Sequence, residues 1–216
     1  SMKLNKSTLS IQIYQILRED ILTQVIPQGT KLTLKMLQER FQVSSTPIRD
    51  AITRLSEEGL VEYYSNIGVN VISLTGQDLE ELYQFMGDLD SLSILYASAH
   101  PDQASIRDQL QRNIEQTSSI ERFSLQSEEE IQSWITASDR FHLIFYDYCR
   151  NSRLTAAANR LRSQLTIFSS SYERQELPQK EILAAHRRIC EAYCIHGVEE
   201  FPSDCRRQPS SQPADD

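Results

Sequence analysis

The chain has 216 residues, 39% of them hydrophobic, and its 22 Lys or Arg against 30 Asp or Glu give a formal net charge of -8. This composition suits an ordinary folded protein of one or two domains. No apolar run approaches the roughly 20 residues that span a bilayer, which argues against a membrane protein and leads us to expect a cytoplasmic one. The 4 cysteines form no Cys-x-x-Cys pair, so neither a zinc ribbon nor a disulfide framework is expected.

Charge is unevenly shared along the chain. Residues 1–75 hold eight Lys or Arg and seven Asp or Glu, a net charge of +1, so the remainder carries -9. A nearly neutral N-terminal part can still bind DNA if its cations lie on one face, although the acidic remainder weakens nonspecific binding. The positions of the cations therefore matter more than their total.

Apolar residues at helical spacing mark two helices early in the chain. The first of these helices breaks at Pro27 and Gly29, and its apolar positions are Leu9, Ile13, Ile16, Leu17 and Ile21. A second, short helix is predicted from about Thr33 to Phe41, and the link "QVSS" follows it. This short link predicts a tight turn into a third helix.

The third helix lies within "VSSTPIRDAITRLSEEGL", residues 43–60. Pro47 suits a first helical turn, and Ser45 or Thr46 can cap the exposed amides. Gly59 is expected to end the helix. The buried stripe is predicted to comprise Ile48, Ala51, Ile52 and Leu55.

A two-stranded hairpin is predicted next, because "LVEYYSNIGVNVISL" alternates around a turn at Asn66 to Gly68. Helix, helix, tight turn, helix and hairpin is the order of a winged helix-turn-helix, in which the N-terminal end of the third helix enters the DNA major groove. Thr46, Arg49 and Thr53 fall on the free face of that helix. Hydroxyls and amides there favour phosphate, and an arginine can bridge to a guanine edge or a phosphate.

This part of the chain resembles the GntR family of bacterial transcription regulators, whose recognition segment typically runs V-S-R-T-P-V-R-E-A-L-x-R-L-x-x-E-G-L-V. Here it reads "VSSTPIRDAITRLSEEGLV", between "IPQGTKLTLKMLQERFQ" and a wing ending in "NIGVNV", and the match covers about residues 8–74. The family usually has an arginine where this chain has Ser45, which predicts weaker binding or a shifted operator preference. The resemblance implies that DNA is contacted by Lys35, Ser44, Ser45, Thr46 and Arg49 from the helices and by Asn66 and Gly68 from the wing.

After residue 75 the chain is predicted to be helical throughout. Helices are expected at about 79–96, 102–122, 128–149, 153–172 and 180–196, the first of them marked by Leu79, Leu82, Met86, Leu89, Leu92 and Tyr96. The terminal segment "FPSDCRRQPSSQPADD" lacks an apolar stripe and is expected to be disordered. The predicted fold class is mainly α: a winged helix-turn-helix at residues 1–75, an all-α helical bundle at 76–200 and a tail at 201–216.

One set of residues in the predicted bundle suits metal chemistry. Asp139 and His142 are three residues apart and share a helix face, and His186 on a later helix could close a site. A histidine in a bundle is also commonly a core or surface residue, so that alternative stays open.

The segments "DRFHLIFYDYCRNSRL" and "AAHRRICEA" resemble the all-helical FCD effector domain of FadR-type GntR regulators, where "FHxxL…GNxxL" and a later "EHxxI" recur. The resemblance implies a divalent metal (Zn, Ni or Mn) at Asp139, His142 and His186, which helps to bind a small organic acid. The chain departs from the family at three places. Ser138 stands four residues before the first histidine, where the family usually has a carboxylate. Met86 stands where the family often has an arginine. The polar tail occupies the place of a further helix that supplies the family's last histidine.

The whole sequence predicts a homodimeric, ligand-responsive regulator that reads an inverted-repeat DNA operator. One rival is a metal-dependent enzyme that uses Asp139, His142 and His186, although no nucleophile with a base partner is evident. A second rival is a regulator whose bundle only dimerises. For Arg49, the alternative is a solvated side chain on an ordinary capped surface helix.

Overall fold

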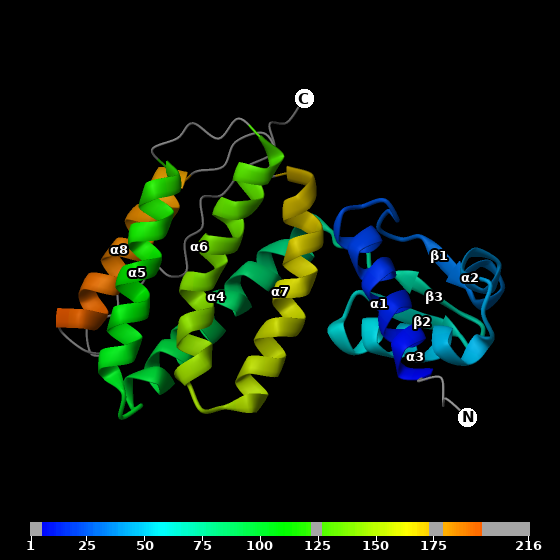
Figure 1. Ribbon diagram of the computed structural model, residues 1–216, viewed down its shortest axis with the longest axis horizontal. Helices are drawn as coiled ribbons and strands as arrows, with labels where there is room; N and C mark the ends of the chain where they lie inside the picture. Colours follow the sequence, from blue (N-terminus) through cyan, green and yellow to red (C-terminus); the bar gives the residue numbers. More distant parts are fainter. Residues whose placement is uncertain (1–5, 122–126, 173–178, 196–216) are drawn as a thin grey trace. The chain divides into compact units, whose positions relative to one another are not determined.

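The computed structural model describes residues 6–121, 127–172 and 179–195 (Figure 1). The chain divides into two compact units. The first comprises Ser1–Leu82 and Asn159–Glu176, and the second comprises Tyr83–Ala158 and Leu177–Asp216. The predicted division at residues 75 and 76 stays a prediction, and the predicted tail, residues 201–216, lies outside the described residues.

The first unit contains three helices and a small antiparallel sheet. Helix α1 is Lys6–Leu22, α2 is Leu34–Phe41 and α3 is Ser45–Glu58. The strands are β1 (Lys31–Thr33), β2 (Val61–Ser65) and β3 (Gly68–Val71), in the order β1-β3-β2. The predicted helices and hairpin are confirmed, and β1 is an additional strand, with Leu32 paired to Val69.

The ends of α2 and α3 follow from local chemistry. Thr33 caps α2 by accepting a hydrogen bond from the Met36 amide, and Gln42 closes that helix in the left-handed conformation. Gly59 ends α3 as predicted, at φ 81°, and its amide donates to the carbonyls of Leu55 and Ser56. Because Gln42 ends α2 three residues before α3 begins, the link between the two helices is the tight turn expected of a helix-turn-helix.

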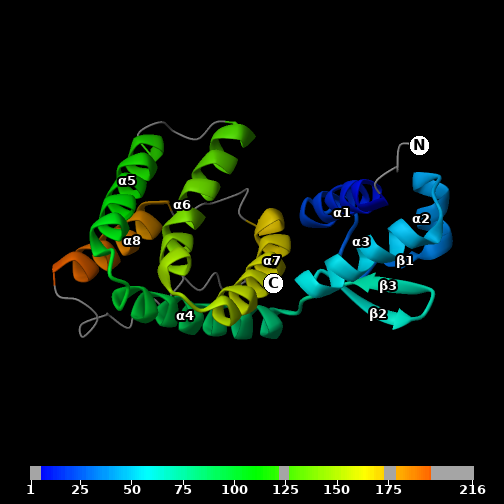
Figure 2. The ribbon, with the colours of Figure 1, turned by 60° about the horizontal axis from the view of Figure 1, so that its bottom comes forward.

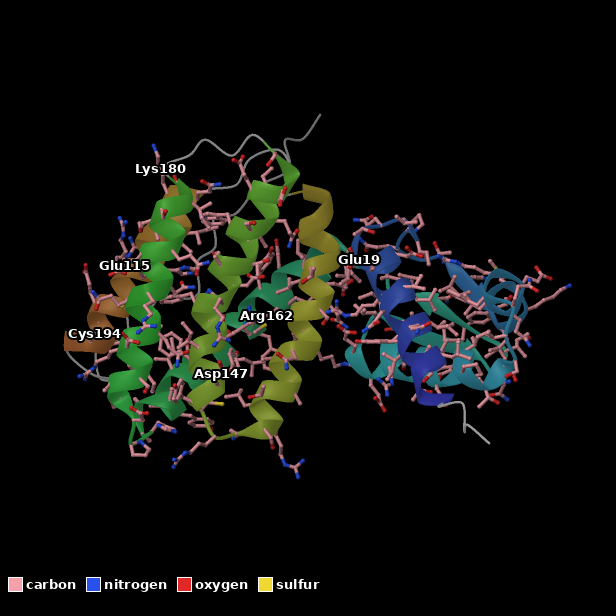
Figure 3. All side chains as sticks on the ribbon, viewed as in Figure 1. Glu19, Glu115, Asp147, Arg162, Lys180 and Cys194 are labelled. Carbon is pink, nitrogen blue, oxygen red and sulfur yellow. The ribbon has the colours of Figure 1, made fainter. Side chains whose placement is uncertain are left out.

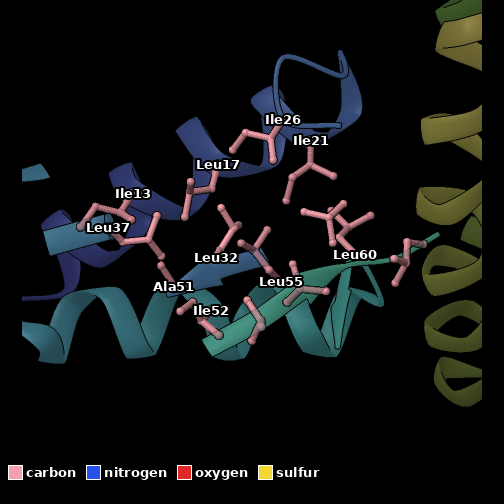
Figure 4. Packing of buried hydrophobic residues seen from close by; sticks show 14 of the residues in the cluster. Ile13, Leu17, Ile21, Ile26, Leu32, Leu37, Ala51, Ile52, Leu55 and Leu60 are labelled. Atoms are coloured by element: carbon pink, nitrogen blue, oxygen red, sulfur yellow. The ribbon is translucent and has the colours of Figure 1, made fainter. Parts of the chain in front are cut away.

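The core of the first unit is aliphatic (Figure 4). Helix α1 packs against α3, and the predicted stripe of α3 is buried: Ile48, Ala51, Ile52 and Leu55. Helix α7, Ser152–Tyr172, contributes the fully buried Ile167 to this same core. Gln24 Nε2 donates to the carbonyl of Ile167 at 3.1 Å, so this segment of α7 is joined to the turn after α1.

The second half of α7 also contacts the C-terminal end of α3. Arg160 Nη1 donates to the carbonyls of Ser56 and Glu57 at 2.9 and 2.7 Å, and Gln164 Nε2 donates to the carbonyl of Gly59 at 3.0 Å. Carbonyls at the end of a helix have no intrahelical partner, and the helix dipole there favours a cation. Arg160 and Gln164 therefore satisfy the terminus of α3.

Glu58, the last residue of α3, gathers three donors. Tyr14 Oη donates to its Oε2 at 2.8 Å, while Arg18 Nε and Ser163 Oγ donate to its Oε1 at 2.8 and 2.7 Å. The donors come from α1 and α7. A half-buried carboxylate with this many partners fixes α1, α3 and α7 to one another within the first unit.

The second unit is helical wherever the structure describes it. Besides the start of α7 it contains α5 (Gln103–Glu121), α6 (Glu128–Tyr148), α8 (Gln179–Ile195) and most of α4 (Gly76–Ser98), so the five predicted helices are confirmed. Helix α5 packs beside both α6 and α8, and α4 runs at a steep angle to α5 and α6 (Figure 2). The core includes the fully buried Ile106, Leu110, Phe141 and Phe145.

Helix α4 differs from its predicted pattern at two apolar positions. Met86 and Leu89 are buried as a helical stripe requires, but Leu92 and Tyr96 are 38% and 39% exposed. Ile94 and Ala97 are buried in their place.

Among the helices that the structure describes, none combines the length and the apolar character of a membrane span.

Candidate functional site

The N-terminal end of α3 presents open backbone amides. Its N-cap residue is Ser44, and neither of the predicted caps, Ser45 and Thr46, bonds to the first amides, nor does any other side chain that the structure describes. Ser44 and Thr46 are exposed, whereas Ser45 is half-buried. An uncapped helix N-terminus carries partial positive charge and donors for an anion such as phosphate.

Arg49 links this helix to the turn of the wing. Its Nη1 donates to the carbonyl of Asn66 at 3.3 Å, and both side chains are exposed. Thr53, one turn further on, donates to the carbonyl of Arg49 at 2.9 Å and lies 3.4 Å from Tyr63 Oη. The predicted free face of α3 therefore lies beside the β2–β3 hairpin.

Lys35 and Gly68 occupy different surroundings. Lys35 is exposed in the first turn of α2. Gly68 is buried, and a Cβ atom there would lie 2.4 Å from Tyr64 Oη and 2.8 Å from the Leu32 carbonyl. Close packing between strands explains this glycine, so its direct role at DNA stays a prediction.

Lys31 and Tyr63 lie at or beside the wing but were not among the residues predicted to contact DNA. The Lys31 ammonium lies 5.7 Å from the centroid of the Tyr64 ring, and Tyr63 is 57% exposed beside Thr53. Lys31 belongs to β1, which is too short to show alternation in the sequence. Its proximity to the hairpin is visible only once β1 pairs with β3.

The two histidines predicted in the bundle lie side by side. His142 Nε2 on α6 and His186 Nε2 on α8 are 3.1 Å apart, within hydrogen-bond distance. The Phe141 ring stacks on His186 at a centroid distance of 4.2 Å. The sequence prediction placed both histidines in one site, although 43 residues lie between them along the chain, and their role as metal ligands stays a prediction.

Asp90 on α4 is the carboxylate beside this histidine pair. Its Oδ2 lies 3.4 Å from His142 Nδ1, and its Oδ1 accepts a hydrogen bond from Tyr146 at 2.7 Å. Asp90 can therefore orient the His142 ring through the nitrogen that faces away from His186. Asp90 was not among the site residues predicted from the sequence, although it lies one helical turn after Met86 on α4.

His186 lies in an environment that keeps its imidazole neutral. The side chain is only 4% exposed. Burial, reinforced by the nearby His142, holds the pKa of His186 well below its ordinary 6.5, and Asp90 offsets this in part. A neutral imidazole can donate from one ring nitrogen and accept, or coordinate, through the other.

The predicted ligand set of Asp139, His142 and His186 is not assembled. Asp139 is exposed, and no three His, Cys, Asp or Glu side chains among the described residues could together hold a metal ion. Two imidazole nitrogens fall short of the three protein ligands typical of an open zinc site, and Asp90 faces the far nitrogen of His142. The described donors do not fit a metal centre, so a bound metal stays a prediction.

Comparisons with known proteins agree with this architecture. Residues 9–71 match "Bacterial regulatory proteins, gntR family", and residues 81–199 match the FCD domain. The chain is 25% identical over 212 residues, 94% of this chain and 92% of the relative, to the uncharacterized HTH-type transcriptional regulator YdhC of Bacillus subtilis (strain 168). Over 65 residues, 29% of this chain and 28% of the relative, it is 45% identical to the HTH-type transcriptional repressor RspR of Escherichia coli (strain K12).

Solved structures share the fold. The structure of E. coli McbR/YncC has a TM-score of 0.65 at 18% identity, covering 92% of this chain and 90% of that one. A structure titled as a putative GntR regulator from Rhodococcus sp. RHA1 has a TM-score of 0.62 at 18% identity, with 88% of both chains covered. At such identities the likeness concerns the fold alone.

A winged helix-turn-helix joined to a helical bundle defines a class of DNA-binding transcription regulators. The chain belongs to the GntR family, in the group of regulators that carry an FCD domain. It is a transcription regulator and not an enzyme, which sets aside the metal-dependent enzyme considered from the sequence.

Proposed function

We propose that the chain is a homodimeric, metabolite-responsive repressor that binds an inverted-repeat operator and senses a small organic acid. The observation that carries this proposal is the exposed face formed by Ser44, Thr46 and Arg49 at the uncapped start of α3, beside the wing. Such a helix terminus suits the major groove, where hydroxyls and amides position the phosphates and an arginine reads a base.

The operator contacts follow from this placement. Residues 1–75 supply them: Lys35, Ser44, Ser45, Thr46 and Arg49 in the helices, with Asn66 and Gly68 in the hairpin. Lys31 and Tyr63 extend the same surface along the wing. Two copies related by a two-fold axis read the two halves of an inverted repeat.

The effector is proposed to bind in the bundle, residues 76–200, near His142 and His186. The neutral imidazole of His186 can donate a hydrogen bond to a carboxylate through the ring nitrogen that does not face His142, without the cost of burying a cation. Met86, where the family has an arginine, is buried and supplies no charge for the effector. Effector recognition in this chain therefore depends on the two histidines and their neighbours. A divalent cation (Zn, Ni or Mn) bound there would need ligands in addition to the two imidazoles.

The exposed apolar side chains of α4 support the dimer. Phe85, Leu92 and Tyr96 are spaced to share one helix face and are 52%, 38% and 39% exposed. Exposed apolar patches of this kind mark interaction surfaces. A second copy of the chain is the occupant that the two-fold operator requires.

Fluorescence anisotropy with the protein's own promoter DNA tests this function. We expect a salt-sensitive complex that needs both halves of an inverted repeat and that a small carboxylate weakens. A promoter complex that no carboxylate affects would support a regulator whose bundle only dimerises. No preference for promoter over random DNA would contradict the proposed operator binding.

A further inference from the structure

Two cysteines lie one helical turn apart on α8. The Sγ atoms of Cys190 and Cys194 are 4.0 Å apart, and both side chains are half-buried. Cys194 lies near the C-terminal end of the helix (Figure 3). Cys149 differs from this pair, because it is buried and its thiol donates to the carbonyl of Tyr146 at 3.3 Å.

The backbone spacing of this pair is close to that of a disulfide. Helical residues at i and i+4 have Cα atoms about 6 Å apart, inside the range of roughly 4.4–6.8 Å found in disulfides. Their Cβ atoms are about 5–6 Å apart, compared with roughly 3.5–4.5 Å in a disulfide. Bond formation therefore needs a tighter last turn of α8, and carbonyls at a helix end have few hydrogen bonds to lose.

We propose that Cys190 and Cys194 form an oxidative modification site, which a hydroperoxide converts into an intrahelical disulfide. A sulfur of the pair attacks a peroxide oxygen, the O–O bond breaks, and a sulfenic acid forms with release of hydroxide or an alcohol. The second thiol attacks the sulfenic sulfur, so the S–S bond forms and the S–O bond breaks. Two thiols lose two electrons and two protons, and with hydrogen peroxide two water molecules are produced.

The environment assigns the order of the two attacks. Burial, followed by the neighbouring Cys194, raises the pKa of Cys190 to about 12, so Cys190 stays a thiol. The first attack is therefore assigned to Cys194, the other sulfur of the pair. Cys190 then resolves the sulfenic acid, because its sulfur is already within 4.0 Å and the step is intramolecular.

Closing this disulfide strains the core of the second unit. Ile189 and Tyr193, on the same end of α8, are buried in the core cluster that Cys190 also contacts. Tyr193 Oη donates to Gln103 Oε1 at 2.7 Å, and Gln103 Nε2 donates to the His100 carbonyl at 2.6 Å. A tighter turn at 190–194 therefore pulls on the contact between α8 and the α4–α5 turn. This response to oxidants goes beyond the proposed sensing of a carboxylate.

The test uses the full chain with Cys205→Ser, which leaves three cysteines. The protein is treated with one equivalent of hydrogen peroxide, denatured and alkylated. We expect the mass of the tryptic peptide 189–206 to be lower than that of the same peptide with two free thiols by the mass of two hydrogen atoms. The peptide should carry no alkyl group, dithiothreitol should restore both thiols, and Cys149 should remain alkylated. The oxidised protein should also unfold at a lower temperature than the reduced protein, and reduction with dithiothreitol should restore the original unfolding temperature.

Single substitutions separate the two roles. In Cys190→Ser, Cys194 should form a sulfenic acid that dimedone traps, and no disulfide should form. In Cys194→Ser, Cys190 should remain fully alkylatable after the same treatment. Two alkylatable thiols in the oxidised parent, a sulfinic acid without a disulfide, or equally fast oxidation of Cys149 would each overturn the proposal.

Discussion

The guanidinium of Arg49 donates a hydrogen bond to the carbonyl of Asn66, with a distance of 3.3 Å from Nη1 to oxygen. This bond joins the recognition helix α3 to the turn of the wing. It restrains an otherwise flexible side chain on the surface that we propose contacts DNA, and less side-chain entropy would then be lost on binding.

Arg49→Ala should weaken operator binding by about 1–3 kcal/mol, the value of a good arginine contact to a base. Arg153→Ala removes the same charge from an exposed position on α7 and serves as the control. Anisotropy titrations at matched salt measure both. Equal affinities of Arg49→Ala and the parent would remove Arg49 from the contact surface.

Ser45→Arg should tighten operator binding, because it restores the cation usual in the family at the start of the recognition helix. The slope of log affinity against log salt should become steeper by about one phosphate contact. Ser45→Ala provides the comparison without added charge. The hypothesis fails if the arginine variant keeps the slope of the parent.

Gly59→Ala should lower the free energy of unfolding by at least about 1–2 kcal/mol, the cost of a left-handed backbone for an L-residue. The φ angle is 81°, and a Cβ atom would lie 2.8 Å from Gln164 Nε2. Gly76→Ala is the matched control, because nothing lies within 4 Å of a Cβ atom there. Urea titrations should separate the two variants, and similar midpoints would contradict the strain argument.

Acid should destabilise the protein through His186. Its folded-state pKa lies well below that of an unfolded histidine, about 6.5. Between these two values the unfolded chain binds more protons, so stability is present above about pH 6.5 and is lost as pH falls toward the folded pKa. Urea midpoints at about pH 7.5 and 5.5, measured with a chelator, should differ less in His186→Gln than in the parent.

Zinc binding distinguishes Asp90 from Asp139. With two imidazole donors we expect weak binding, abolished in both His142→Ala and His186→Ala. Asp90→Asn should reduce the affinity by about 10–100-fold, as loss of a group that orients a ligand does. Asp139→Asn should leave it unchanged, because Asp139 forms no metal-binding group with the two histidines among the described residues. Elemental analysis and competition titration measure these effects, and loss of zinc in Asp139→Asn would restore the ligand set inferred from the sequence.

Local patterns account for what the sequence predicted. The apolar stripe of α3 and the turn glycine at its end are set by neighbours a few residues away, so periodicity and turn chemistry suffice. Strand β1 was missed because three residues cannot show alternation. The segment is a strand because Leu32 pairs with Val69, a residue that is distant in the sequence.

The histidine site in the bundle was likewise predicted only in part. His142 and His186 were predicted as a pair from family spacing, and their nitrogens meet. Asp139 was chosen because it is three residues from His142 on one helix, yet it is exposed, whereas Ser138 beside it is buried. Asp90 comes from another helix, and only the packing of α4 against α6 places it at His142.

The contribution of α7 to the first unit bears on how the protein is made. Residues 159–176 complete that unit, but residues 83–158 must leave the ribosome before them. Until Ile167 is synthesised, its place in the core stays empty, and the terminal carbonyls of α3 lack the donors of Arg160 and Gln164. The recognition helix of a nascent or proteolysed chain that ends before α7 is therefore less stable than in the complete chain. DNA binding is thus delayed until most of the helical bundle has also been synthesised.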